Sequence, residues 1–555
     1  MVTVMATDMA TVMKKNRLSS PRPLTVALAL LLALPATAQQ QNVTGALPTQ
    51  GIGTPAKMDD ANRNDTEDTQ QNRRAWAISP RIGLSLTATD HANISGYNNR
   101  GESDLITEIT PGIRIDTQTA RLRGYFDYSL RGQIYTQNGG SRHQNSLNSF
   151  VTLEAVDNWF FVDVSGNIAQ QSISAFGPQS PGDTSINSNS TETATWRVSP
   201  YIRGTFGGLA DYTLRYNASA TRADDSRQAS NLDVSQWIAQ LRGGTPFHNL
   251  QWSLDGNRQT ADYANGRKTD ADLARILATY LITPQFSISA SGGWERNNYA
   301  ALNDENTTTY GYGFDWNPTP RTQISAFRER RFFGHGHRFS ISHRFPMSSI
   351  RYSDSRDVSV LPNQFAMGGM GSIYDMYFDY FAAQIPDPLL RAAFVNALLT
   401  SSGIDPNRQV VSGFLSSRAS NQRRQQLSYV LQGARNSLTL QLQRNEDSAI
   451  ALALTPGADD FSHSSKIRQK GVSLNFSHRL TPLSNLNIMA SRQKSSGNYT
   501  GTANLDSRTT LYQISLATKL GKKTTGSLSA RHAKYEGNSN SYSENALIAT
   551  FLYTY

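Results

Sequence analysis

The sequence predicts an all-β protein, a large antiparallel transmembrane β-barrel of the outer-membrane type. Three features predict it. Apolar and polar residues alternate along many long segments, short turns alternate with longer polar connections, and the chain ends on an aromatic residue. Counting hairpins gives about 22 strands, within a range of 20–24, and one short helical insertion is expected among them.

The alternation has a period of two. In the first predicted strand, Ile78, Ile82 and Leu84 share one face, and Arg81 and Ser85 share the other. The same pattern recurs at 120–134, 159–170, 248–259, 310–316, 438–443 and 472–477. A soluble sandwich also alternates, but its strands are usually about 5–6 residues long, and these are longer.

The connections alternate in length. Short turns are expected at 117–119, 156–158, 245–246, 283–284, 317–320 and 481–482. Longer polar segments are expected at 172–191, 223–230, 262–269 and 446–465. Short periplasmic turns and long external loops are typical of outer-membrane barrels, whereas a sandwich has no reason for this regularity.

Composition agrees with this fold class. The 555 residues include no cysteine, 38% are hydrophobic and only 17% are charged. The mean hydropathy is −0.47, and no apolar run long enough for a membrane helix follows residue 38. The net charge of +10 is mild and is not gathered into a Lys/Arg block, so no nucleic-acid partner is expected.

The N-terminal 75 residues read as export and tail segments. Residues 1–38 resemble a signal peptide, with a basic region, an apolar core at 24–34 and cleavage between Ala38 and Gln39. Residues 39–75 are polar and low in complexity, so we expect a disordered periplasmic tail. The barrel is then expected over 76–555, in the outer membrane of a Gram-negative bacterium.

The final strand predicts how the barrel is assembled. Phe551, Tyr553 and Tyr555 share one face with the alternating apolar residues before them. This ending resembles the signal read by the barrel-assembly machinery, which is therefore an expected partner together with outer-membrane lipid. An interruption at 372–402 breaks the two-residue period and predicts a short helical hairpin, on a side of the barrel that the pattern leaves open.

No catalytic, cofactor-binding or metal site emerges, and the chain is not expected to be an enzyme. His335 and His337 have metal-like spacing but no third ligand, and a tight polar loop explains them better. Ser340 and Ser342 alternate with His343 and so point away from it, which argues against a lipase.

Paired acids are the remaining candidates for catalytic carboxylates. Asp59-Asp60 and Asp459-Asp460 lie in tail or loop contexts, so we expect them to be solvated.

The polar face of the strands predicts the lumen. Tyr125, Tyr135 and Tyr201 would offer stacking faces to sugars, and Arg258 recurs with the other strand arginines. Either a salt-bridged wall or a basic lining suited to an anionic or hydroxylated polymer would explain these residues. The candidate lumen-lining residues are Arg81, Arg114, Arg123, Arg131, Arg197, Arg203, Arg215, Asp127 and Asp255.

Two stretches carry a family resemblance. Residues 270–345, which include WNPTPRTQISAFRERRFFGHGHRFSISHR, and residues 414–440, FLSSRASNQRRQQLSYVLQGARNSLTL, resemble outer-membrane barrels associated with the PEP-CTERM/exosortase system. The resemblance implies a barrel linked to exopolysaccharide and transfers no catalytic residue. The expected function is porin-like export or surface assembly of polysaccharide. The alternatives are a structural or adhesive barrel acting through its external loops and, third, a barrel hydrolase.

Overall fold

The computed structural model describes residues 75–95, 102–137, 140–182, 184–224, 231–247, 249–264, 266–360, 391, 413–450, 459–499, 505–538 and 541–555. The chain divides into two units, residues 1–43 and 44–555, and every described residue belongs to the second. The predicted signal peptide, the tail apart from Ala75, and the predicted helical insertion apart from Arg391 lie outside the described residues.

The described chain forms one antiparallel sheet of 22 strands. The strands are β1 (Trp76–Thr89), β2 (Asp104–Gln118), β3 (Leu122–Tyr135), β4 (Gly140–Val156), β5 (Phe160–Ser172), β6 (Ser190–Phe206), β7 (Ala210–Ala223), β8 (Leu232–Gly244), β9 (Leu250–Tyr263), β10 (Thr269–Thr283), β11 (Phe286–Asn297), β12 (Glu305–Thr319), β13 (Thr322–Arg331), β14 (Gly334–Arg344), β15 (Ser348–Ser359), β16 (Ser420–Gln432), β17 (Asn436–Ala449), β18 (Ser464–Arg479), β19 (Ser484–Tyr499), β20 (Leu505–Lys519), β21 (Thr524–Gly537) and β22 (Ser541–Thr554).

Helical structure is nearly absent from the described residues. The one helical element with defined bounds there is the 3-10 turn η4 (Asp460–Ser462), which is not the short insertion that the sequence predicts. No helix in the described ranges is long and apolar enough to cross a membrane.

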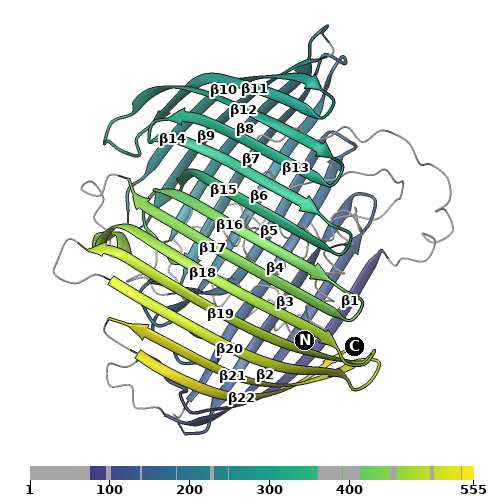
Figure 1. The fold of residues 1–555 in the computed structure, drawn as a ribbon, viewed down its shortest axis with the longest axis vertical. Helices are drawn as coiled ribbons and strands as arrows, with labels where there is room; N and C mark the ends of the chain where they lie inside the picture. The colour runs from purple at the N-terminus through teal and green to yellow at the C-terminus, as the bar shows by residue number, and fades with distance from the viewer. Residues whose placement is uncertain are drawn as a thin grey trace, which may run out of the picture. The chain divides into compact units, whose positions relative to one another are not determined.

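The sheet closes on itself. Each strand pairs with the next, and β1 pairs with β22 in a register that places Leu84 opposite Phe551. Figure 1 shows the green and yellow strands β15–β22 crossing in front of the blue strands of the opposite wall. The predicted fold class and the count of 22 strands are therefore confirmed.

The two faces of the wall differ as the alternation predicts. On β1, Ile78, Ile82 and Leu84 are 61%, 47% and 45% exposed, and their neighbours on the opposite face are polar or small. Because cross-strand partners share a face, the register carries this outward apolar band around the whole barrel. A closed sheet with an apolar exterior satisfies its backbone internally, as an outer-membrane β-barrel must.

The connections separate into two rims. Those that follow even-numbered strands have 2–5 residues, and this end is called the short-turn rim. The other end, the long-loop rim, carries the longest connections, among them 90–103, 173–189 and 450–463. All the predicted short turns and long segments fall on the expected rims. The connection from β15 to β16, which includes the predicted insertion, starts and ends at the long-loop rim.

The chain end belongs to the short-turn rim. The Tyr555 N–H donates to the Pro80 carbonyl at 2.9 Å and so extends the seam between β22 and β1. Phe551 and Tyr555 are 46% and 68% exposed, and the Tyr553 ring lies edge-on to that of Tyr555. The aromatic row predicted for the last strand is thus present on the outward face.

Candidate functional site

The strand register places all nine candidate lumen-lining residues on the inward face. Arg114 is directly opposite Asp127, and Arg215 is directly opposite Tyr201, while the outward apolar residues occupy the alternate positions. Arg258, which recurs with these arginines in the sequence, lies instead on the outward face, directly opposite the exposed Trp237.

Part of the inner wall is held by ion pairs. Asp127 receives Arg81 at 2.5 Å and Arg114 at 3.3 Å, and Arg114 also pairs with Asp116 at 2.7 Å. These side chains come from three consecutive strands, β1 to β3. This cluster fits the expectation of a salt-bridged wall.

Asp255 joins a second cluster farther around the barrel. Its carboxylate lies 3.8 Å from Arg275, which also pairs with Glu329 at 3.0 Å. Arg123 and Arg131 lie inward on β3, opposite Thr152 and Gln144 of β4.

A different arrangement occupies the inner face of β5 to β7. Phe161 and Tyr201 stack with their centroids 5.1 Å apart and their planes 15° apart. The Arg203 guanidinium lies 4.4 Å from the Phe161 centroid, and that of Arg215 lies 3.9 Å from the Tyr201 centroid. Arg215 also pairs with Asp163 at 2.7 Å. We call the four residues Arg203, Phe161, Tyr201 and Arg215 the arginine–aromatic stack.

The inner face of β5 to β7 carries more basic side chains than acidic ones. Arg197 lies on the same face, two residues before Ser199 on β6, and its surroundings include Arg215. Among the described residues, no acidic side chain pairs with Arg197 or Arg203. A charge-rich wall with unpaired guanidiniums can hold carboxylates, phosphates or sugar hydroxyls, because guanidinium groups donate several hydrogen bonds in one plane.

The tyrosines do not present the open faces that the sequence predicts. Tyr201 is sandwiched between Phe161 and Arg215, and the Arg114 guanidinium lies 5.1 Å from the Tyr125 centroid. Phe161 itself escaped sequence reasoning. The sequence signal that could have found it is an aromatic residue at a polar-face position of its strand, on the same face as Asp163 and two residues before it.

The long connection from β5 to β6 folds into the barrel. We call the described residues of this connection, 173–182 and 184–189, the crossing segment. Its backbone carbonyls accept hydrogen bonds from inward-facing tyrosines: Tyr535 donates to Phe176 and Tyr542 to Gln179, each at 2.5 Å. Because β21 and β22 are six and five strands from β5 around the ring of 22, the segment reaches across part of the lumen near the long-loop rim.

The crossing segment is also fixed on the near side of the ring. Tyr135 of β3 donates to the Thr184 carbonyl at 2.8 Å, and Ile186 exchanges backbone hydrogen bonds with Ala92 and Ile94. Tyr135 therefore anchors backbone and is not a free stacking platform.

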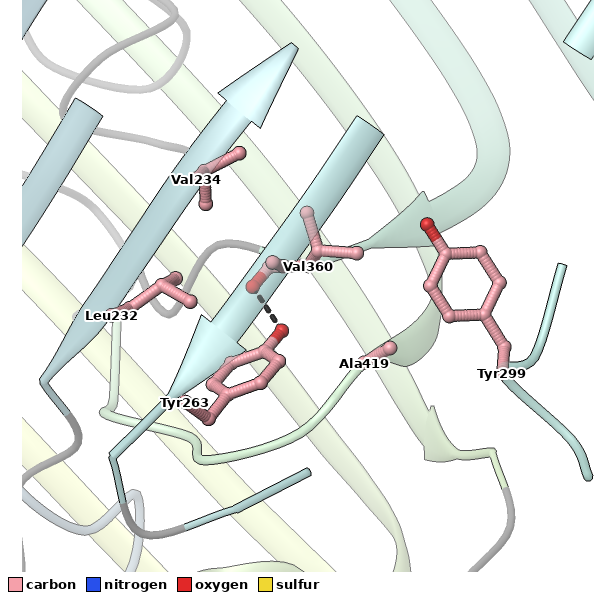
Figure 2. Packing of buried hydrophobic residues seen from close by; sticks show 7 residues of the cluster. Leu232, Val234, Tyr263, Tyr299, Val360 and Ala419 are labelled. Atoms are coloured by element: carbon pink, nitrogen blue, oxygen red, sulfur yellow. Dashed lines mark hydrogen bonds between the residues drawn. The ribbon is translucent and has the colours of Figure 1, made fainter. Parts of the chain in front are cut away.

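A second inward connection lies against β8 and β9. Residues 413–419 form the docking segment, which precedes β16. Figure 2 shows Ala419 beside Tyr263, whose hydroxyl donates to the Val360 carbonyl. Leu232 and Val234 belong to the same buried cluster. The cluster ties the start and the end of the β15–β16 connection to the inner wall.

The crossing and docking segments contact each other and also the end of the β17–β18 connection, at Asp459 and Asp460. The Leu415 N–H donates to the Ile173 carbonyl at 3.3 Å, which joins the docking and crossing segments. Asp460 accepts the Ser174 hydroxyl and the Ala175 N–H, both at 2.7 Å. Burial raises the pKa of Asp460 to about 6, and the adjacent Asp459 charge acts in the same direction.

Asp459 holds the docking segment. Its carboxylate pairs with Arg418 at 2.7 Å, and the two side chains are only 2% and 3% exposed. It also accepts the Ser417 N–H at 3.1 Å. The prediction that Asp459-Asp460 is solvated is therefore wrong. The sequence shows two acids in a polar loop, and only the fold brings two other loops, the crossing and docking segments, into contact with them. Asp59-Asp60 lies outside the described residues.

The histidines stand apart from the lumen. His335 and His337 belong to strand β14 and face outward, opposite Arg330 and Arg328, so the prediction of a tight polar loop is wrong. His337 meets one carboxylate, Asp354, at 3.0 Å, and no metal-binding group of three occurs in the described part of the chain.

The predicted opposition of serine and histidine on β14 also holds in the structure. Ser340 and Ser342 face inward, whereas His343 faces outward, where it hydrogen-bonds with Thr322 at 2.8 Å.

Comparison with known proteins gives structural neighbours only. No family model matches the chain, and no curated protein matches it. The FrpB iron transporter from Neisseria meningitidis (F3-3 variant) is 10% identical, with a TM-score of 0.46, over 87% of this chain and 82% of that one. A ferric enterobactin receptor (PfeA) mutant from Pseudomonas aeruginosa is 7% identical, with a TM-score of 0.41, over 86% and 80%.

The outer membrane protein opdK from Pseudomonas aeruginosa is 8% identical, with a TM-score of 0.32, over 86% of this chain and 99% of that one. At these identities and TM-scores the neighbours carry no information on ligand or mechanism. The fold described above depends on the strand pairing of this chain.

Proposed function

We propose that this barrel is a passive outer-membrane channel for anionic or heavily hydroxylated solutes, with the crossing segment as its constriction. The long-loop rim is then external, because outer-membrane barrels have short periplasmic turns. The observation that carries the proposal is the inner wall of β5 to β7, where Arg197 and Arg203 have no acidic partner among the residues that the structure describes.

Anionic exopolysaccharide is the polymer class we propose as cargo. This choice combines the resemblance to exosortase-associated barrels with the chemistry of the wall. Arg203 and Arg197 are partly exposed, whereas the two rings of the stack, Phe161 and Tyr201, are buried. A guanidinium backed by a ring is held in place, so less conformational entropy is lost when it binds a carboxylate.

The adhesive alternative depends on external loops, of which 172–191 is one. The structure folds this connection inward, and its carbonyls are bonded to Tyr535, Tyr542 and Tyr135. It is therefore not displayed at the surface for attachment. This observation favours the channel over the adhesive barrel.

Planar-bilayer recording of the purified protein tests the proposal. The wild type should conduct with a preference for anions, and an oligomer of a uronic acid added on one side should block the current. The variant Arg197→Gln/Arg203→Gln should lower the anion preference and the block by several-fold, since two unpaired charges leave the lining. Arg258→Gln, on the outward face, is the matched control and should change neither.

A variant lacking residues 175–188 should conduct more than the wild type. The proposal fails if both proteins stay closed at every voltage, or if the Arg197/Arg203 variant keeps its ion preference.

A further inference from the structure

The outward face of the barrel divides into two unlike sectors. On strands β13 to β21, twelve basic side chains face outward near the long-loop end, with four acidic ones among them. The basic residues are Arg328, Arg330, Arg356, Arg423, Arg444, Lys466, Arg468, Lys470, Arg492, Lys494, Arg508 and Lys534. The acidic ones are Asp354, Glu446, Asp506 and Glu536.

The remaining strands show the opposite balance. Among the described strand residues of β1 to β12 and β22, the outward basic residues are Arg222, Arg258 and Arg296. The outward acidic residues there are Glu192, Asp233, Asp262, Asp270 and Asp272. The basic sector is therefore a property of one side of the barrel.

The core of the sector is a row of like charges. Arg444 of β17 is directly opposite Lys470 of β18, Lys470 is opposite Lys494 of β19, and Lys494 is opposite Arg508 of β20. Neighbouring strands lie only about 4.8 Å apart, and like charges directly opposite each other are destabilising. Such a row is costly unless anions lie over it.

The acids within the sector neutralise the row only in part. Glu446 is shared by Arg444 at 3.4 Å, Arg468 at 3.4 Å and Lys466. Lys494 lies 3.5 Å from Asp506, and Arg508 lies 3.3 Å from Glu536, which Lys534 also contacts. No acidic partner of Lys470 occurs among the described residues.

The row lies at the far edge of the apolar band. Arg444 is the ninth residue of β17, and Leu438, Leu440 and Leu442 precede it on the same face. A tilted strand needs about 9–11 residues to cross the hydrocarbon layer, so the row falls where the lipid headgroups of the external leaflet lie. Tyr512, 54% exposed and next to this edge, fits the aromatic girdle found at such boundaries.

We infer that the outward sector of β17 to β20 is a binding site for the phosphate groups of anionic lipid in the external leaflet. The occupant is lipid and not a free ion, because the row adjoins the apolar band on which acyl chains would pack. Phosphate oxygens accept hydrogen bonds from both guanidinium and ammonium groups, and one phosphate can bridge two neighbouring cations of the row. This site is independent of the lumen and of what passes through it.

Native mass spectrometry of the full mature protein in mild detergent tests the inference. The probes are lipid A with two phosphates, lipid A with one, and phosphatidylethanolamine. Affinity should fall in that order. The variant Arg444→Gln/Lys470→Gln/Lys494→Gln should weaken binding of the two-phosphate lipid by at least about tenfold, since each basic residue near an anionic surface contributes to its attraction.

The matched control is Arg222→Gln/Arg258→Gln/Arg296→Gln, which removes three outward charges from the opposite sector and should change the affinity less than about twofold. A heat-modifiable shift in gel mobility verifies that each variant is folded. If the triple variant does not fold, Lys470→Gln alone should still weaken binding, and Lys470→Arg should preserve it.

An equal loss of affinity for lipid A with two phosphates in the row variant and in the control variant would overturn the inference. So would equal wild-type affinity for lipid A with two phosphates and for phosphatidylethanolamine.

Discussion

Asp459 and Asp460 are adjacent in the chain, yet they hold different segments. Asp459 carries a full ion pair with Arg418. Asp460 accepts hydrogen bonds from the crossing segment and forms no ion pair within the described part of the chain. A buried carboxylate without a cationic partner shifts its pKa upward, as that of Asp460 does. Substitution of Asp459 should therefore act by breaking an ion pair, whereas pH should act on Asp460.

Substituting Asp459→Asn should release the docking segment. Removing one partner of a buried ion pair leaves the Arg418 charge uncompensated, which costs roughly 3–5 kcal/mol. Because the pair joins loops and not strands, the barrel should remain folded. Hydrogen exchange of the backbone amides of 413–419 should accelerate strongly. The matched control is Asp157→Asn, which breaks the exposed pair with Arg121 and should leave this exchange unchanged.

Acid should tighten the attachment of the crossing segment. The pKa of Asp460 is raised from 3.8 to about 6 when the segment is in place. The attached state therefore binds more protons between these values, so attachment is strongest below pH ~4 and weakens as pH rises through ~6. Single-channel conductance should be lower at pH 5 than at pH 7.5. Asp460→Asn should abolish that difference, and a difference that survives the substitution contradicts this role.

At the scale of elements, the strands could be predicted and the inward loops could not. Residues such as Leu438, Leu440 and Leu442 must face lipid, and a two-residue period leaves them only one way to do so. Turn residues then set the rims. Each of these rules is local, so a single sequence is sufficient to apply them.

The crossing segment obeys no such local rule. Its polar residues suit water outside the barrel and hydrogen-bonding partners inside it equally well. What distinguishes the two is long-range: Tyr535 and Tyr542 lie more than 300 residues beyond the carbonyls to which they donate. A usable signal existed in the aromatic residues at polar-face positions, Phe161, Tyr201 and Tyr535 among them. These rings are not needed for lipid contact and therefore indicate packing within the lumen.

The same limit explains the candidate site. The alternation of polar and apolar residues predicted that Arg197, Arg203 and Arg215 face inward. It could not predict their contacts. Asp163 pairs only with Arg215, and the guanidiniums of Arg203 and Arg215 cover rings that belong to neighbouring strands. The position of a residue in the alternation thus predicts which face of the sheet it lies on, but not which side chain it contacts.

At the scale of the whole molecule, closure decides whether the protein is stable in a membrane. The seam between β1 and β22 is the one junction formed by the two ends of the barrel, and its register runs from Arg81 opposite Thr554 to Thr89 opposite Ala546. An open edge in lipid would leave a row of backbone groups without partners. The proposed recognition of Phe551, Tyr553 and Tyr555 by the assembly machinery concerns the strand that completes this seam.

A cross-link across the seam tests closure and register together. The chain has no cysteine, so Ser85→Cys/Thr550→Cys introduces one unique pair, directly opposite on the inward face. Opposed side chains on neighbouring strands have Cβ atoms about 4.5–5.5 Å apart, close to the reach of a disulfide. Oxidation of the folded protein should therefore form the bond in most molecules, read as a band that resists unfolding in gel electrophoresis. The out-of-register pair Ser85→Cys/Ala546→Cys should form little, and equal cross-linking of both pairs would show that the seam slips.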